Sequence, residues 1–233
     1  MDGSAHALDP MALTLFDVSA TSDGSLLDGT SRVVERVAQP KTTYAYQVRD
    51  RSLWRQRFDR PIFTLATRSA GSIIAAHATN RFATDVTIDG EQSGLFCFTT
   101  LLHGQSALIN HTGDATATPG CGLVFRPGPA TRLLISDDNA RVNVFLDAAA
   151  VESALERLLE RHLPSPLEFR PLIDWSCGLG ASLKRQLDLL ALEFQRPDGI
   201  ASNAVALASM TDLLIPLVLQ GTAHNYSDAM HQR

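Results

Sequence analysis

The strongest constraint on the fold is a run of short β-prone segments between residues 61 and 146. Turn signals such as Asp89-Gly90, His103-Gly104 and Pro119-Gly120 separate these segments. About eight short strands at this spacing are typical of a β-sandwich or β-barrel. The expected strands are Ile62–Leu65, Ser72–His77, Asp85–Ile88, Leu95–Leu102, Ser106–Asn110, Leu123–Phe125, Arg132–Ile135 and Val142–Leu146.

Beyond Asp147 the spacing of apolar residues changes to that of helices. Three apolar stripes follow, and Pro197-Asp198-Gly199 supplies a turn between the last two. The fold class we predict is therefore α+β, mainly β, with a helical segment after the barrel. The stripes are Val151, Leu155, Leu158 and Leu159, then Leu179, Leu183, Leu187, Leu190 and Phe194, then Val205, Ala208, Met210, Leu213, Leu214 and Leu217.

The first sixty residues are less regular. Residues 1–40 carry scattered polar residues and short apolar clusters, which predicts a mostly irregular arm. In residues 42–59 a helix would bury Tyr46, Trp54 and Phe58 and expose several arginines. We therefore expect an N-terminal arm followed by a helix.

The composition excludes several classes of protein. The chain has 233 residues, of which 45% are hydrophobic and 19% charged, as in ordinary soluble domains. Its net charge of -5 argues against nucleic-acid binding by this part alone. Three widely spaced cysteines form no CxxC pair, and the N-terminus lacks the pattern of a secretory signal. The apolar segment from Ala204 to Leu219 contains polar residues and a proline, so we expect a buried helix and not a membrane span.

One motif points to a family. Gly120 is followed by five residues and then by Arg126-Pro127-Gly128-Pro129-Ala130-Thr131. This stretch resembles the second motif of cupins, in which the same spacing leads to Pro-x-Gly-x-x-His. The wider pattern over residues 60–232 resembles the cupin-like sensor domain of AraC/XylS-family transcription regulators. The resemblance implies a jelly-roll barrel followed by helices.

The metal ligands of cupins are replaced in this chain. Thr131 occupies the position of the motif histidine, and Arg126 stands where the motif has proline. Counting back from Gly104 puts Cys97 at the position of the cupin glutamate, and residues 89–93, where two histidines are expected, contain none. Since a metal site needs three or four convergent donors, we expect no metal, no cofactor and no catalytic residues.

The resemblance also indicates where a ligand would bind. If Cys97 and Thr131 face the inside of the barrel, alternation places Thr99 and Leu133 there as well. In the last strand Val142, Val144 and Leu146 form an apolar face suited to packing on a helix. The opposite face is expected to point inward and carries Arg141, Asn143 and Phe145.

Two further residues complete the predicted ligand site. His77 and Arg81 lie near the end of the second barrel strand, where a cation can meet an acidic group of the ligand. A structural role at the barrel rim is the alternative for both. An aromatic or other small organic acid is the expected effector class, with sugars as the alternative.

The domain organisation follows from these assignments. We expect an arm and helix over residues 1–60, an effector-binding barrel over 61–147, and a dimerisation region over 148–233 that ends in a linker. The resemblance implies a small-molecule effector, a homodimer in the bacterial cytoplasm, and promoter DNA bound by a helix-turn-helix domain missing from this chain. No membrane partner is expected. An atypical cupin metalloenzyme, an isomerase or dioxygenase, and a protein-interaction module with a filled barrel are the alternatives.

Two uses are open for the second leucine stripe. Its residues either form the dimer interface or pack in the core of the chain. We assign them to dimerisation because a closed barrel leaves little surface for two leucine-rich helices to cover. The residues concerned are Leu179, Leu183, Leu187, Leu190 and Phe194.

Overall fold

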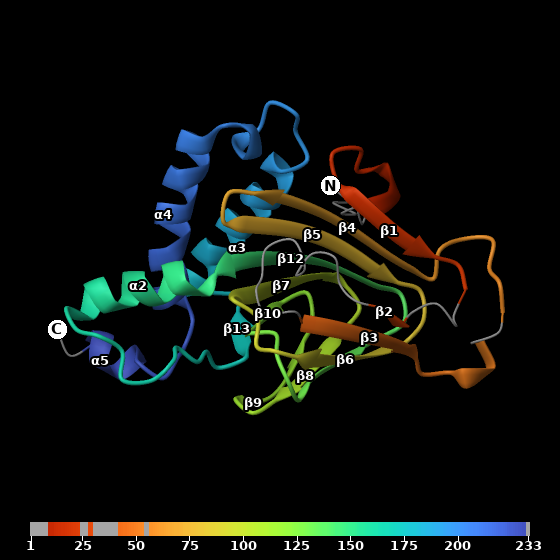
Figure 1. Ribbon diagram of the computed structural model, residues 1–233, viewed down its shortest axis with the longest axis horizontal. Helices are drawn as coiled ribbons and strands as arrows, with labels where there is room; N and C mark the ends of the chain where they lie inside the picture. The colour runs from red at the N-terminus through yellow and green to blue at the C-terminus, as the bar shows by residue number, and fades with distance from the viewer. Residues whose placement is uncertain (1–8, 24–27, 30–41, 54–55, 232–233) are drawn as a thin grey trace.

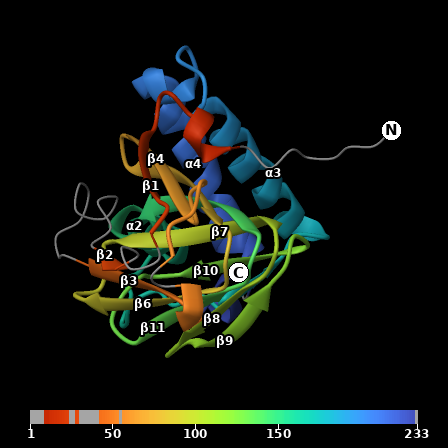
Figure 2. The same ribbon diagram turned by 90° about the vertical axis from the view of Figure 1, so that its right-hand side faces the viewer.

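The computed structural model describes residues 9–23, 28–29, 42–53 and 56–231 (Figure 1). Within them, two antiparallel sheets lie face to face, and helices cover the outer side of one sheet (Figures 1 and 2). The molecule therefore has three layers. From one side to the other they are the helices, a seven-stranded sheet and a six-stranded sheet.

The seven-stranded sheet has the order β1-β4-β5-β12-β7-β10-β13 and the six-stranded sheet the order β2-β3-β6-β11-β8-β9. Several neighbouring strands, such as β5 and β12 or β6 and β11, are far apart in sequence, as in a jelly roll, so the fold class predicted from the sequence is confirmed. The strands are β1 (Asp17–Thr21), β2 (Asp28–Gly29), β3 (Thr42–Val48), β4 (Phe63–Ala70), β5 (Ile73–Asn80), β6 (Thr84–Gly90), β7 (Leu95–His103), β8 (Ser106–Asn110), β9 (Gly113–Ala117), β10 (Cys121–Phe125), β11 (Thr131–Ile135), β12 (Asn139–Asp147) and β13 (Leu172–Asp174).

Four α-helices follow the last long strand: α2 (Ala148–Leu159), α3 (Gly178–Glu193), α4 (Ala204–Gly221) and α5 (Ser227–His231). Polar caps set two of their starting points. The Asp147 carboxylate accepts a hydrogen bond from the Ala150 amide at 2.7 Å, and the Asn203 side chain accepts from the amides of Val205 and Ala206. Short 3-10 turns lie at Pro10–Ala12, Arg51–Leu53 and Ile200–Ser202.

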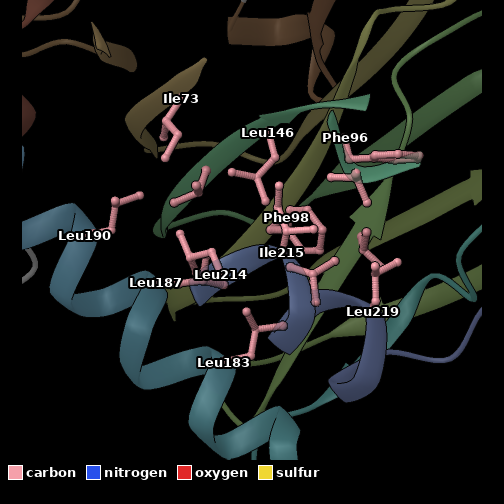
Figure 3. Close-up of a cluster of buried hydrophobic side chains, with 14 of the residues drawn as sticks. Ile73, Phe96, Phe98, Leu146, Leu183, Leu187, Leu190, Leu214, Ile215 and Leu219 are labelled. Carbon is pink, nitrogen blue, oxygen red and sulfur yellow. The ribbon is translucent and has the colours of Figure 1, made fainter. Parts of the chain in front are cut away.

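The larger hydrophobic core lies between the seven-stranded sheet and the helices. Leu183, Leu187 and Leu190 of α3 point toward the sheet, together with residues of α4 (Figure 3). They meet the outward face of the strands, which carries Ile73, Ala75, Phe96, Phe98, Val144 and Leu146. We call this surface of the sheet the helix face.

This packing corrects the assignment of the second leucine stripe. Leu183, Leu187, Leu190 and Phe194 are fully buried inside the chain, so they cannot meet a second copy unless the core opens. The expectation failed because it treated the barrel surface as already covered. The helix face is a broad apolar area, and α3 and α4 cover it. Leu179 is 41% exposed and is the one residue of the predicted set left at the surface.

The N-terminal part contains more strand than the sequence indicated. Residues 42–48 form β3, which pairs with β6 over its whole length, in place of the helix expected over 42–59. Tyr44, Tyr46 and Val48 alternate along the strand, and that period places side chains on one face of a sheet. In the arm, β1 pairs with β4, and Leu13 and Phe16 are buried in the core. The rest of the predicted arm, residues 1–8, 24–27 and 30–41, lies outside the described residues.

Helix α4 is long and apolar enough to cross a membrane by length and composition, with a mean hydropathy of 1.6. A third of it is buried inside the chain. Leu207, Met210, Leu214, Ile215, Val218 and Leu219 form the buried side in contact with α3 and the sheet. Its other side carries exposed apolar residues, including Val205 and Leu213.

Candidate functional site: an inner cavity with a buried arginine

The two sheets enclose a cavity of about 50 Å³, which we call the inner cavity. Since a buried water takes roughly 10–15 Å³ of such space, the cavity has room for about four waters or one compact organic molecule. Its wall mixes aliphatic, aromatic and polar side chains. The lining residues are Tyr44, Tyr46, Leu65, Ala76, Val86, Cys97, Thr99, Ser106, Leu123, Phe125, Leu133, Ile135, Arg141, Asn143 and Phe145.

Strand alternation puts most of the predicted residues here. In β12, Arg141, Asn143 and Phe145 face the cavity, while Val144 and Leu146 belong to the core on the helix face. Cys97 and Thr99 reach the cavity from β7, and Leu133 reaches it from β11. The predicted inward direction of these six side chains is therefore correct. Their role in binding a ligand is a prediction that the geometry does not test.

Arg141 is the most unusual group in the wall. Its side chain is buried, with the residue only 7% exposed, and Nη1 donates to Asn80 Oδ1 at 2.6 Å and to Asn139 Oδ1 at 2.9 Å. Within the described residues, no carboxylate forms an ion pair with it, and the lining contains no acidic side chain. Burial lowers the pKa of Arg141 to about 10, so the guanidinium is still charged at neutral pH. The cavity therefore holds one uncompensated positive charge.

The neighbouring polar groups are neutral. Burial raises the pKa of the Cys97 thiol to about 12 and raises the pKa of Tyr44 well above its usual value. The hydroxyl of Thr99 donates to Asn143 Oδ1 at 2.9 Å across β7 and β12. The buried Tyr44 hydroxyl has no hydrogen-bond partner in the described structure. The wall thus presents neutral hydrogen-bonding groups around a single cation.

His77 lies on the opposite side of the sheet from the predicted position. Its neighbours Ala76 and Ala78 are in successive positions of β5, and Ala76 lines the cavity, so alternation turns His77 to the helix face. There its ring packs edge-on against Phe16, at 5.4 Å between centroids. Burial lowers the pKa of His77 to about 4, which keeps the ring neutral. The assignment of His77 to the ligand site is not supported by this position.

Arg81 and Thr131 also lie outside the inner cavity. Arg81 follows the end of β5, with its guanidinium near the rings of Phe58 and Phe82 and 3.9 Å from Asp59. Since β5 ends at Asn80, Arg81 is not part of the strand that faces the cavity. Its side chain lines an open groove outside the barrel. This is the rim role that was the alternative for Arg81.

Thr131 starts β11 and lines a neighbouring pocket of about 300 Å³ at the end of the barrel. Phe125 lines both spaces and forms the wall between them. His111, from the turn after β8, and Glu168 both line this outer pocket, with His111 Nε2 3.4 Å from Glu168 Oε1. Thr131 is on the inward face of its strand, but it lines the outer pocket, whereas Arg141 lines the inner cavity.

Tyr44 and Tyr46 are among the cavity residues that the sequence interpretation missed. Both come from β3, which was expected to be a helix. The alternating Tyr-x-Tyr-x-Val pattern, preceded by two threonines, is the signal that predicts a strand with one aromatic face. Among the described residues no three His, Cys, Asp or Glu side chains are placed to share a metal ion.

The fold and the cavity together define a cupin-like ligand-binding domain. The model of the AraC-binding-like domain family matches residues 46–220. The chain therefore belongs to this family, as the cupin-like motif implied, and it is a cupin-like AraC-type effector-binding domain. No curated protein matches it.

One solved structure supports the fold, and two others are more distant. The AraC-like transcriptional activator CuxR superposes with a TM-score of 0.52 at 13% identity, over 75% of this chain and 59% of that chain. This chain thus spans about three fifths of the CuxR chain. A transcriptional regulator from Vibrio cholerae gives 0.31 at 9% identity, over 39% of this chain and 54% of the other. A Bacillus subtilis oxalate decarboxylase variant gives 0.29 at 10% identity, over 36% and 25%.

Proposed function

We propose that this chain is the ligand-sensing and dimerisation part of an AraC/XylS-type transcription regulator. A small organic effector, an organic acid as the first class to test, binds in the inner cavity. Binding favours one of two arrangements of the molecule and so controls transcription. In this proposal the protein is a cytoplasmic bacterial homodimer without enzymatic activity, and a separate helix-turn-helix domain contacts promoter DNA.

One observation carries the sensing role: polar side chains line a cavity inside an AraC-binding-like domain. Thr99, Arg141 and Asn143 face this space from the middle of buried strands. Burying such groups is costly unless they gain partners, and stability alone favours apolar side chains at these positions. Thr99 and Asn143 bond to each other and Arg141 donates through Nη1 alone, so a bound polar molecule supplies partners for the remaining N–H groups of Arg141.

Thermal-shift screening of the purified protein tests this role. The panel contains small organic acids, aromatic acids and sugars, because a wall of mixed polarity suits the polar groups of all three classes. A ligand present at 100 times its dissociation constant adds about 2.7 kcal/mol to the free energy of unfolding. We expect at least one class to raise the melting temperature. A complete panel without any shift favours the interaction module with a filled barrel.

A cupin metalloenzyme is the second candidate, and the cupin-like fold is the observation that favours it. Thr131 and Cys97 stand at two cupin ligand positions but line different spaces. Cys97 lines the inner cavity, and Thr131 lines the outer pocket. Elemental analysis of the purified protein separates the two candidates. Stoichiometric iron, zinc or manganese, lost together with an activity, favours the enzyme.

For the homodimer we propose that the exposed side of the C-terminal helices forms the interface. Leu192 of α3 is 55% exposed, and on α4 Val205 and Leu213 are 78% and 48% exposed. Large apolar side chains gathered on packed helices are typical of interaction surfaces. Leu179 belongs to the same exposed set.

Light scattering of a Leu213→Glu variant tests the interface. We expect the mass to fall from dimer to monomer while the circular dichroism spectrum is unchanged, because Leu213 is outside the core. Thr116→Glu in β9, exposed and on a strand of the other sheet, is the control and is expected to leave the mass unchanged. A dimeric Leu213→Glu variant contradicts this interface.

A further inference from the structure

We propose that the inner cavity binds a compact monocarboxylate and that Arg141 holds its carboxylate group, with the hydroxyls of Tyr44 and Tyr46 as further donors. This inference rests on the proposed sensing function and names its ligand class. It concerns this cavity alone and not the outer pocket or the open groove beside Arg81.

The charge of the cavity is the first reason. Arg141 is buried without an acidic partner in the described part of the chain, and its two recorded hydrogen bonds go to amide oxygens through Nη1 alone. A buried cation lacking a counter-ion is strongly unfavourable. An anion in the adjoining space removes that cost, whereas a neutral ligand leaves it in place.

The hydrogen-bonding groups are the second reason. Nη2 and Nε of Arg141 have no partner among the described residues, and neither does the buried Tyr44 hydroxyl. Asn80 and Asn139 fix Nη1 from outside the cavity, which orients the guanidinium. The free donors match the two oxygens of a carboxylate, the group that a guanidinium binds most specifically.

The tyrosines remain donors at physiological pH. Burial raises the pKa of both Tyr44 and Tyr46, and the nearby charge of Arg141 acts on Tyr46 in the opposite direction. Both tyrosines belong to the same strand, β3, and their rings stack with 6.5 Å between centroids. A protonated hydroxyl can donate a hydrogen bond to a carboxylate oxygen.

The size of the cavity is the third reason. About 50 Å³ accommodates roughly four waters, which corresponds to a molecule of a few heavy atoms. Leu123, Phe125, Leu133 and Phe145 supply apolar wall for a short hydrocarbon part. A benzoate-sized ligand requires side chains such as Phe125 to move, so short-chain acids are expected to bind in preference to aromatic acids.

Titration calorimetry on the intact chain tests the proposal, with propionate, butyrate, lactate and benzoate as acids and propionamide, butyramide and lactamide as neutral partners. We expect a short-chain acid to bind and its amide to bind at least about tenfold more weakly, because a hydrogen bond to a charged group is lost. This comparison uses the wild-type protein and does not depend on any variant.

Variants then locate the charge. Arg141→Gln is expected to weaken acid binding at least about tenfold and amide binding much less, so that the preference for acid over amide is lost. Arg141→Lys, which keeps the charge, is expected to retain the preference for acid over amide. Arg81→Gln, the same change at an exposed arginine outside the cavity, is the matched control and should bind as the wild type does. Circular dichroism checks that each variant is folded.

Two results overturn the proposal in different ways. If an amide or a sugar binds as tightly as the acids, or if Arg141→Gln binds acids unchanged, the carboxylate assignment is wrong and the sensing function stands. If neither acids nor amides bind the wild-type protein and the thermal-shift panel, which includes sugars, gives no shift, the carboxylate assignment and the sensing function both fail.

Discussion

The two faces of the seven-stranded sheet use the same strands for opposite purposes. On the helix face, Phe96, Phe98 and Leu146 are buried in one hydrophobic core with the leucines of α3 and α4 (Figure 3). On the cavity face, Thr99 and Arg141 border a space for a small molecule. Adjacent residues of one strand thus belong to the core and to the cavity wall, and alternation along the strand decides which of the two each residue joins.

This contrast explains how a domain can keep costly polar groups inside. The helix face supplies a large apolar core, and the stability of that core offsets the burial of Arg141 and its neighbours. Changes on the helix face should therefore alter the free energy of unfolding, while changes on the cavity face should alter ligand binding. The predictions below test this separation, beginning with the largest effect on stability.

Shortening a buried leucine of α3 should cost the most. Leu187 is almost completely buried against the sheet, so we expect Leu187→Ala to lower the free energy of unfolding by about 3 to 4 kcal/mol. Arg185→Ala, at an exposed position of the same helix that is not among the residues named for the interface, should change it by less than about 0.5 kcal/mol. Urea unfolding followed by circular dichroism measures both, and equal effects would contradict the assignment of the stripe to the core.

Acid should destabilise the helix face through His77. The pKa of His77 is lowered from 6.5 to about 4 in the folded state, so between these values the unfolded chain binds a proton that the folded chain does not. Stability therefore falls as the pH drops from 6.5 to 4, by up to about 3 kcal/mol from this residue.

The His77→Leu variant isolates this contribution, because all carboxylates titrate alike in both proteins. We expect the difference in unfolding free energy between wild type and variant to change across this pH range and to be constant above pH 7. A difference that does not vary with pH would show that His77 is protonated as easily when folded as when unfolded.

A methyl group added at Gly122 should have the next largest effect on the free energy of unfolding. A Cβ atom there would lie 2.0 Å from Cζ2 of Trp175, so the indole ring must move. We expect Gly122→Ala to cost about 2 kcal/mol. Gly120→Ala, two residues earlier and with open space around its Cβ, is the control. Thermal unfolding of the two variants measures the effect, and similar melting temperatures would show that Trp175 is loosely packed.

The smallest effect is expected on the far sheet. Arg132 forms an ion pair with Asp85 across β11 and β6, with half of the arginine side chain exposed. Replacing Asp85 with Asn should cost about 0.5 kcal/mol at low salt and less at high salt. Urea unfolding at two salt concentrations measures this. A large loss independent of salt would mean that Asp85 supports the sheet in another way.

Much of this division between faces could be predicted from the sequence because it depends on local periodicity. In β12, Val144 and Leu146 alternate with Asn143 and Phe145, and a period of two in a strand admits one assignment of faces once the apolar side is known. The glycines and prolines between the strands located the turns, because turn preference is also a local property of the sequence. The cupin-like spacing after Gly120 then supplied the family.

The remainder depends on tertiary packing, which local periodicity does not encode. Leucines at helical spacing are equally suited to a core and to an interface. Leu187 is in the core because α3 and α4 cover a broad apolar face of the sheet, and the sequence does not show the area of that face. Tyr44 and Tyr46 were assigned to a helix because arginines further along obscured their alternation. His77 was assigned to the cavity from its nearness to the strand end, although its parity in β5 points the other way.

A crystal structure of the chain with its tightest-binding short-chain acid tests the central claim most directly. The account predicts density for the acid between the two sheets, with carboxylate oxygens about 2.7–2.9 Å from Arg141 nitrogens and the hydrocarbon part against the apolar wall. Density for the acid in the outer pocket near Phe169 or in the groove beside Arg81, with side chains filling the space next to Arg141, would contradict it.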